Sequence, residues 1–162
     1  MAFPRLLELE IHAGHIEPDE FDNIIEPFPL LNKLYIRAKT PQIRALFRYL
    51  QPNTLRHLHL EDDTPSATSW AKILESINVK ASSLAHFRPE HHFEIPDLQV
   101  SVSADTTQNA FYNSVVTNYG KLYMDLATME TLRNLKHLRH FVCDVTIPSV
   151  VSDKDIAKIV SW

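Results

Sequence analysis

The stretch Thr54–Leu60, with the sequence TLRHLHL, decides the fold class, because Leu55, Leu58 and Leu60 form an L-x-x-L-x-L unit that recurs on both sides of it. Successive side chains of a β-strand point to opposite faces of the sheet. A strand over this unit therefore turns its aliphatic side chains toward a core. The two histidines between the leucines point to the opposite face, where their contacts become the functional question.

Copies of this unit follow one another at a spacing near 25 residues over the first half of the chain. The fourth copy has Pro89 at its last position, so we expect its strand to be shorter than the others. The long interval before the fifth copy, which ends at Cys143, predicts a divergent unit or an inserted loop at residues 88–123. The five units begin at Leu6, Leu31, Leu55, Leu84 and Leu138.

The segments between the units carry apolar residues at helical spacing, i, i+3, i+4 and i+7. Thr40 followed by Pro41 is typical of an N-cap with proline at the first helical position. Strand, loop and helix repeated at one period predict an α/β fold, a leucine-rich-repeat-like solenoid with a parallel sheet on its concave face. A doubly wound sheet also alternates strands and helices, but it gives no reason for repeated strand triplets. The helical stripes occupy residues 21–28, 43–50 and 70–77.

The composition narrows the function classes. The 162 residues fit a single domain, residues 1–162, and 16 Lys and Arg against 20 Asp and Glu give a net charge of −4. Such a charge creates no field that would gather nucleic acid, so we expect no nucleic-acid partner. The sequence has neither a signal peptide nor a run of about 18 apolar residues. We therefore expect no membrane contact and an intracellular location, cytoplasmic or nuclear.

Aligning the units predicts two rows of side chains on the sheet face away from the core. If the strands pair in register, neighbours within a row lie about 4.8 Å apart. Exposed polar and aromatic rows on a rigid sheet are where solenoids bind partners, so we expect these residues to contact another protein. A solvated sheet face without a partner is the alternative. The first row is Glu8, Lys33, His57 and His86, and the second is Glu10, Tyr35, His59 and Arg88.

No catalytic site is indicated, and we expect neither a cofactor nor a metal ion. His57, His59 and His86 could converge on zinc, which would make a metal-dependent hydrolase the alternative function, but no fourth ligand stands at a matching position. The single cysteine, Cys143, holds the third apolar position of its unit and reads as a buried core thiol. Glu61–Asp63 suits a solvated loop after the strand.

Several segments resemble the leucine-rich-repeat regions of fungal F-box proteins. They are the Phe-Pro-x-Leu sequence at Phe3–Leu6, the LRNLKHL sequence at Leu132–Leu138, the SDKDIA sequence at Ser152–Ala157, and Trp162. The resemblance implies a protein-interaction module similar to the substrate-recognition repeats of a ubiquitin-ligase subunit. A cullin-RING ligase adaptor would be a partner only if an F-box precedes this chain.

The sequence departs from that family in two respects. Gly14, Lys39 and Asp63 stand where regular leucine-rich repeats carry asparagine or cysteine, so we expect no asparagine ladder. No F-box is visible, and the chain opens inside a repeat and stops within an expected helix. We therefore expect a fragment, and a truncated gene product without independent function is a further alternative.

Overall fold

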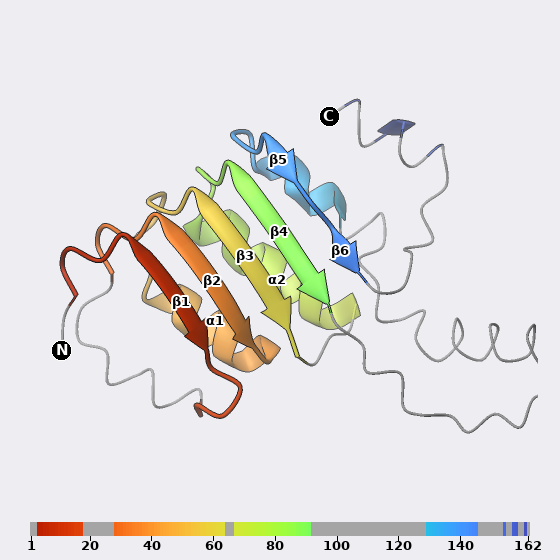
Figure 1. Ribbon diagram of the computed structural model, residues 1–162. Helices are drawn as coiled ribbons and strands as arrows, with labels where there is room; N and C mark the ends of the chain where they lie inside the picture. The colour runs from red at the N-terminus through yellow and green to blue at the C-terminus, as the bar shows by residue number, and fades with distance from the viewer. Residues whose placement is uncertain are drawn as a thin grey trace, which may run out of the picture.

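The computed structural model describes residues 3–17, 28–63, 67–91 and 129–145, together with four separate residues between 154 and 161. These residues form a parallel β-sheet with two α-helices and one 3₁₀ turn (Figure 1). In chain order the elements are β1 (Glu8–His12), β2 (Lys33–Ala38), α1 (Thr40–Arg48), β3 (His57–Asp62), α2 (Ala67–Lys80), β4 (His86–His91), η3 (Thr131–Asn134), β5 (His140–Phe141) and β6 (Asp144–Val145).

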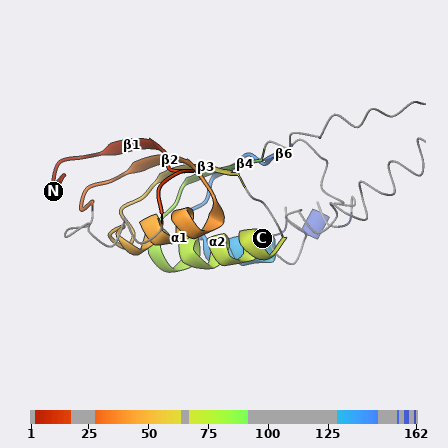
Figure 2. The ribbon, with the colours of Figure 1, turned by 90° about the horizontal axis from the view of Figure 1, so that it is seen from below.

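The strands lie in the order of the chain, β1-β2-β3-β4, and both β5 and β6 pair with the far side of β4. All of these pairings are parallel. Helices α1 and α2 pack side by side beneath the same face of the sheet (Figure 2). The α/β class is thus confirmed. In the part of the chain that the structure describes, the strand order does not reverse and the other face carries no helix, unlike a doubly wound sheet.

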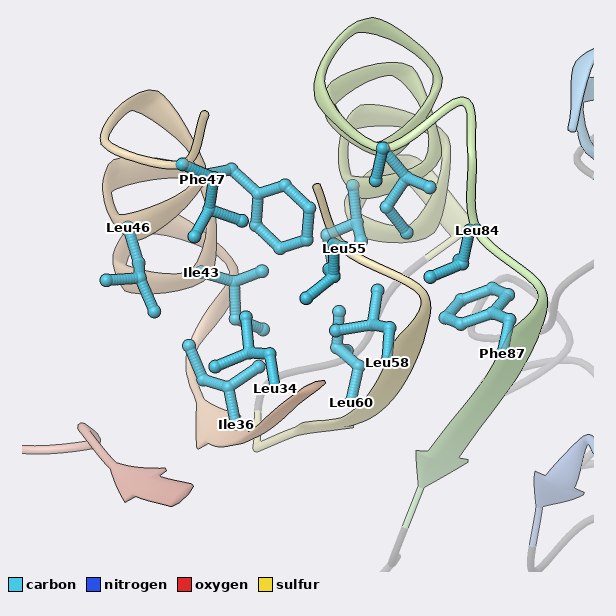
Figure 3. Packing of buried hydrophobic residues seen from close by; sticks show 14 of the residues in the cluster. Leu34, Ile36, Ile43, Leu46, Phe47, Leu55, Leu58, Leu60, Leu84 and Phe87 are labelled. Carbon is cyan, nitrogen blue, oxygen red and sulfur yellow. The ribbon is translucent and has the colours of Figure 1, made fainter. Parts of the chain in front are cut away.

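The core lies between the sheet and the two helices, and the repeated aliphatic positions supply it (Figure 3). Leu34 pairs in register with Leu58, which pairs with Phe87, so equivalent positions of neighbouring units meet. The helices contribute their expected stripes: Phe47 and Trp70 are both 1 % exposed. Further buried residues are Ile36, Ile43, Leu46, Leu55, Leu60, Ile73, Leu74, Ile77 and Leu84.

One backbone arrangement recurs where neighbouring strands begin. The carbonyl of Asn32 accepts hydrogen bonds from the amides of both Arg56 and His57, at 2.8 and 3.1 Å. The carbonyls of Leu7, Arg56 and Ala85 accept the corresponding pair of amides from the next unit along the sheet. Each strand therefore starts at the same height as its neighbour. This shared start fixes the register that aligns the face residues.

The fourth strand is not shorter, as Pro89 had led us to expect. β4 has six residues, as many as β2 and β3. The carbonyl of Phe87 accepts a hydrogen bond from Val142 on the fifth-strand side, and strand backbone groups alternate in direction. The missing amide of Pro89 therefore faces the break between β5 and β6, where no ladder bond is lost. Residues 88–91 belong to β4, and the rest of the 88–123 segment lies outside the described residues.

Three further expectations are corrected. Lys39, not Thr40, is the N-cap of α1, and the Thr40 hydroxyl instead donates to Asp62 Oδ2 at 2.9 Å. Glu61 and Asp62 are not in a solvated loop: both belong to β3 and are 4 % and 1 % exposed. Cys143 is half-buried between β5 and β6 and is not a fully buried core thiol.

Other expectations concern segments outside the described residues. These include most of the helical stripe at 21–28, whose last residue, Phe28, is buried, and most of the C-terminal sequence resembling the F-box family. Among the described helices, none has the length and apolar character needed to cross a membrane.

Candidate docking face of the sheet

The two predicted rows are present on the sheet face opposite the helices. Strand pairing places Glu8, Lys33, His57 and His86 in one register, and Glu10, Tyr35, His59 and Arg88 in the next. All eight side chains line one groove of about 580 Å³, which we call the docking groove. The residues that the aligned repeats placed in each row are therefore neighbours in the structure, because the repeated leucines fix the register of the strands.

The first row continues to a residue that the sequence interpretation missed. His140 pairs with His86 across β4 and β5 and also lines the docking groove. The signal was present in the sequence, since Leu138 precedes His140 by two residues just as Leu55 precedes His57. Aligning the fifth unit with the others would have identified it.

Three histidines of this row form a continuous column, the histidine stack, made of His57, His86 and His140. The ring centroids of His57 and His86 are 4.2 Å apart with planes at 12°, and those of His86 and His140 are 4.4 Å apart at 4°. The pKa of His57 is lowered from its ordinary value, first by burial and then by His86 and Lys33, against the opposing effect of Glu8. The stack therefore favours a neutral His57.

A third row runs beside the other two and contains Glu61, which the sequence interpretation assigned to a loop. Arg37, Glu61 and Glu90 pair in register across β2, β3 and β4. Glu90 contacts His59 Nε2, and its Oε2 lies 3.6 Å from Arg88 Nη2. The sequence signal for this row was the alternation itself, because Glu61 continues the outward period-two positions of β3.

Glu61 fixes the position of the second row through a hydrogen bond with Tyr35. Its Oε2 accepts a hydrogen bond of 3.1 Å from the Tyr35 hydroxyl, and its side chain is 5 % exposed. Arg37 Nε lies 3.3 Å from Glu61 Oε1, but no hydrogen bond forms at that oxygen, and Arg37 donates instead to Asp63 Oδ1 at 3.1 Å. Burial, and then the bond to Glu61, raise the pKa of Tyr35.

The same network orients the aromatic ring of Tyr35 within the groove. The ring of His59 meets it edge to face, with centroids 4.5 Å apart and planes at 82°. Edge-to-face pairs of this kind favour a fixed relative orientation of the two rings. The second row therefore presents Tyr35 and His59 as a rigid pair, with their positions set by Glu61 and Glu90.

The geometry argues against the zinc alternative. The rings of His57 and His86 stack face to face, so their nitrogen lone pairs lie in nearly parallel planes and do not converge on one point. Over the described ranges, no group of three or more His, Cys, Asp or Glu side chains is arranged to hold a metal ion. The side chains on this surface are hydrogen-bonding, aromatic and charged.

Comparison of the chain with protein-family models, with curated proteins and with solved structures gives no significant match.

Proposed function

We propose that this chain is a leucine-rich-repeat-like solenoid whose docking groove recognises another protein. The support for the solenoid is that strands follow one another in chain order, with helices on one face and the same paired amide-to-carbonyl arrangement at each strand start. Stacked βα units of this kind share one core and leave the sheet face available for binding.

The observation that carries the proposal is the alignment of eight predicted side chains in one groove. None of them is needed to fill the core, which lies on the other side of the sheet. Tyr35, His57 and His59 are half-buried and held by neighbouring rings, so they lose little freedom when a partner binds. Aromatic and arginine side chains on such surfaces supply much of the binding energy in protein interfaces.

The resemblance to fungal F-box proteins suggests which class of protein the docking groove recognises. We propose that the recognised protein is a substrate of a ubiquitin ligase. A cullin-RING adaptor would be a further partner only if an F-box precedes this chain. The docking groove would then select the substrate.

The test compares two triple variants in affinity capture followed by quantitative mass spectrometry. The face variant is H57A/H59A/R88A. The control variant, R44A/K72A/E75A, changes exposed residues on the helix side and alters the formal net charge by the same amount. We expect one captured protein to fall at least about tenfold with the face variant and to persist with the control. Equal capture by both variants, or stoichiometric zinc in the purified protein, would contradict the proposal.

A further inference from the structure

The histidine stack is placed where a partner could reach it. It crosses three adjacent strands, β3, β4 and β5, and His140 at its outer end is exposed. Among the described residues, its three rings contact one another and form no hydrogen bond or ion pair. No carboxylate of the described residues forms a hydrogen bond or ion pair with these three imidazoles. Protonation of the rings would therefore make this part of the face cationic.

The carboxylates of Glu8 and Glu10 on β1 each have a partner on β1 or β2. Glu8, the carboxylate at the far end of the same row, accepts a hydrogen bond of 2.6 Å from Lys33 Nζ. Lys33 then stands between Glu8 and His57 in register. Glu10 lies in the second row, where its Oε1 is 3.9 Å from His12 Nε2. Glu8 raises the pKa of His57 by its charge, but its hydrogen bond goes to Lys33, and neither acid forms a hydrogen bond or ion pair with a ring of the stack.

The groups on β3, β4 and beyond give the same result. Two residues along from the stack, His59 and Arg88 both approach Glu90, and the neighbour of His140 in the groove is the apolar Val142. The carboxylates of the described part of this face thus face other cations. Among the described residues, no further carboxylate is left to pair with the protonated stack.

We propose that the histidine stack, with Arg88 beside it, binds an acidic segment of a protein partner and does so more tightly as the pH falls. This inference rests on the proposed function of the docking groove and names its partner class. Carboxylates at alternate positions of an extended peptide lie about 6.6 Å apart. This separation exceeds either spacing between successive rings, 4.2 and 4.4 Å, and is shorter than the whole column, so two such carboxylates fit along the column, whereas one small anion cannot reach all three rings.

The sign of the pH dependence follows from linkage. The pKa of His57 is lowered in the free protein by burial, by His86 and by Lys33, against the opposing effect of Glu8. A bound carboxylate favours the protonated ring, so binding raises that pKa and takes up a proton. Affinity then increases as pH falls toward the lower, free-state pKa, while peptide glutamates stay ionised above about pH 4.3. An average uptake of about half a proton over this pH range predicts about tenfold tighter binding at pH 5.5 than at pH 7.5.

The experiment measures the binding of a fluorescein-labelled hexaglutamate peptide to the full chain by fluorescence anisotropy at pH 5.5 and 7.5. The test variant is H86N/H140N. The matched control is H15N/H137N, which removes two exposed histidines that do not line the groove. Circular dichroism verifies that both variants are folded. As a second readout, NMR titration of the imidazole resonances follows the pKa of His57 in the wild-type protein with and without peptide.

We expect about tenfold tighter binding at the lower pH in the wild type and the control, weaker binding with a smaller pH difference in H86N/H140N, which retains His57, and a higher pKa of His57 with peptide bound. Binding that is absent, independent of pH or equally impaired in both variants would overturn the inference. So would equally tight binding of a dT hexanucleotide. If peptide binding fails but capture of the partner still falls with the face variant, the inference about the acidic segment is wrong and the proposed function is retained. The failure of the inference can thus be distinguished from the failure of the proposed function.

Discussion

Replacing Tyr35 with Phe should destabilise the protein through one identifiable bond. The substitution removes the hydroxyl that donates to Glu61 Oε2 at 3.1 Å, and leaves a carboxylate whose side chain is only 5 % exposed without that donor. Hydrogen bonds to charged groups contribute about 1.5 to 3 kcal/mol. Because Tyr35 is half-buried, water can partly replace its hydroxyl, so we expect a loss of about 1.5 kcal/mol, which is about 3 to 6 °C in Tm for this chain length.

A double-mutant cycle with Y35F and E61A isolates the pair from its neighbours. Urea unfolding of the wild type, both single variants and the double variant gives the coupling energy, which we expect to be about 1 kcal/mol. Independent sites add to within about 0.5 kcal/mol. A coupling energy below that value would refute the assignment of Glu61 as the anchor of the second row.

The same pair predicts a response to alkaline pH. The pKa of Tyr35 is raised above its ordinary value of 10.0 in the folded protein. Its contribution to stability is therefore complete below about pH 10 and is lost as the pH rises through the higher, folded-state pKa. Y35F lacks this group, so the stability difference between wild type and Y35F should narrow above pH 10. A constant difference would show that the tyrosine ionises equally in both states.

Two further predictions concern the core and the histidine stack. L58A should lower the free energy of unfolding by about 3 kcal/mol, whereas L9A, at the equivalent but half-buried position of β1, should cost about 1 kcal/mol; equal losses in urea unfolding would contradict the difference in burial. The pKa of His57 is lowered in the folded state, so its stabilising contribution is present above about pH 6.5 and is lost as pH falls through the folded-state value. H57N should therefore lose less stability than the wild type between pH 7 and pH 5, and parallel stability curves would exclude this role.

The alignment of the docking groove could be predicted from the sequence because one local pattern fixes it. The spacing of Leu55, Leu58 and Leu60 predicts which side chains of this strand face the core. The recurrence of the spacing predicts which residues of the other strands lie beside those of this strand. A slip of one residue would turn every leucine to solvent. The rows that contain His57 and Tyr35 then follow without knowledge of any contact, and the structure has them in that register.

The burial of Glu61 and Asp62 could not be predicted in the same way. A buried carboxylate needs partners, and here these are Tyr35 and Thr40, which lie 26 and 22 residues earlier in the chain. No local pattern shows such a pairing, so three successive acids were read as a loop. Pro89 was misjudged for a related reason, since its tolerance depends on a break in the neighbouring strand and not on its own sequence context.

The docking face carries two clusters that differ in their hydrogen bonding: the network around Glu61 and Glu90, and the histidine stack. Glu61 and Glu90 each have a partner on an adjacent strand, although Glu61 Oε1 accepts no hydrogen bond, so this network holds Tyr35 in place. The histidine stack is open, because its rings form no hydrogen bond or ion pair with the residues that the structure describes. A network of this kind resists change on binding, while an open column gains from an incoming anion. We therefore expect the selection of a partner to depend on the column that begins at His57, the residue at the centre of the most regular repeat.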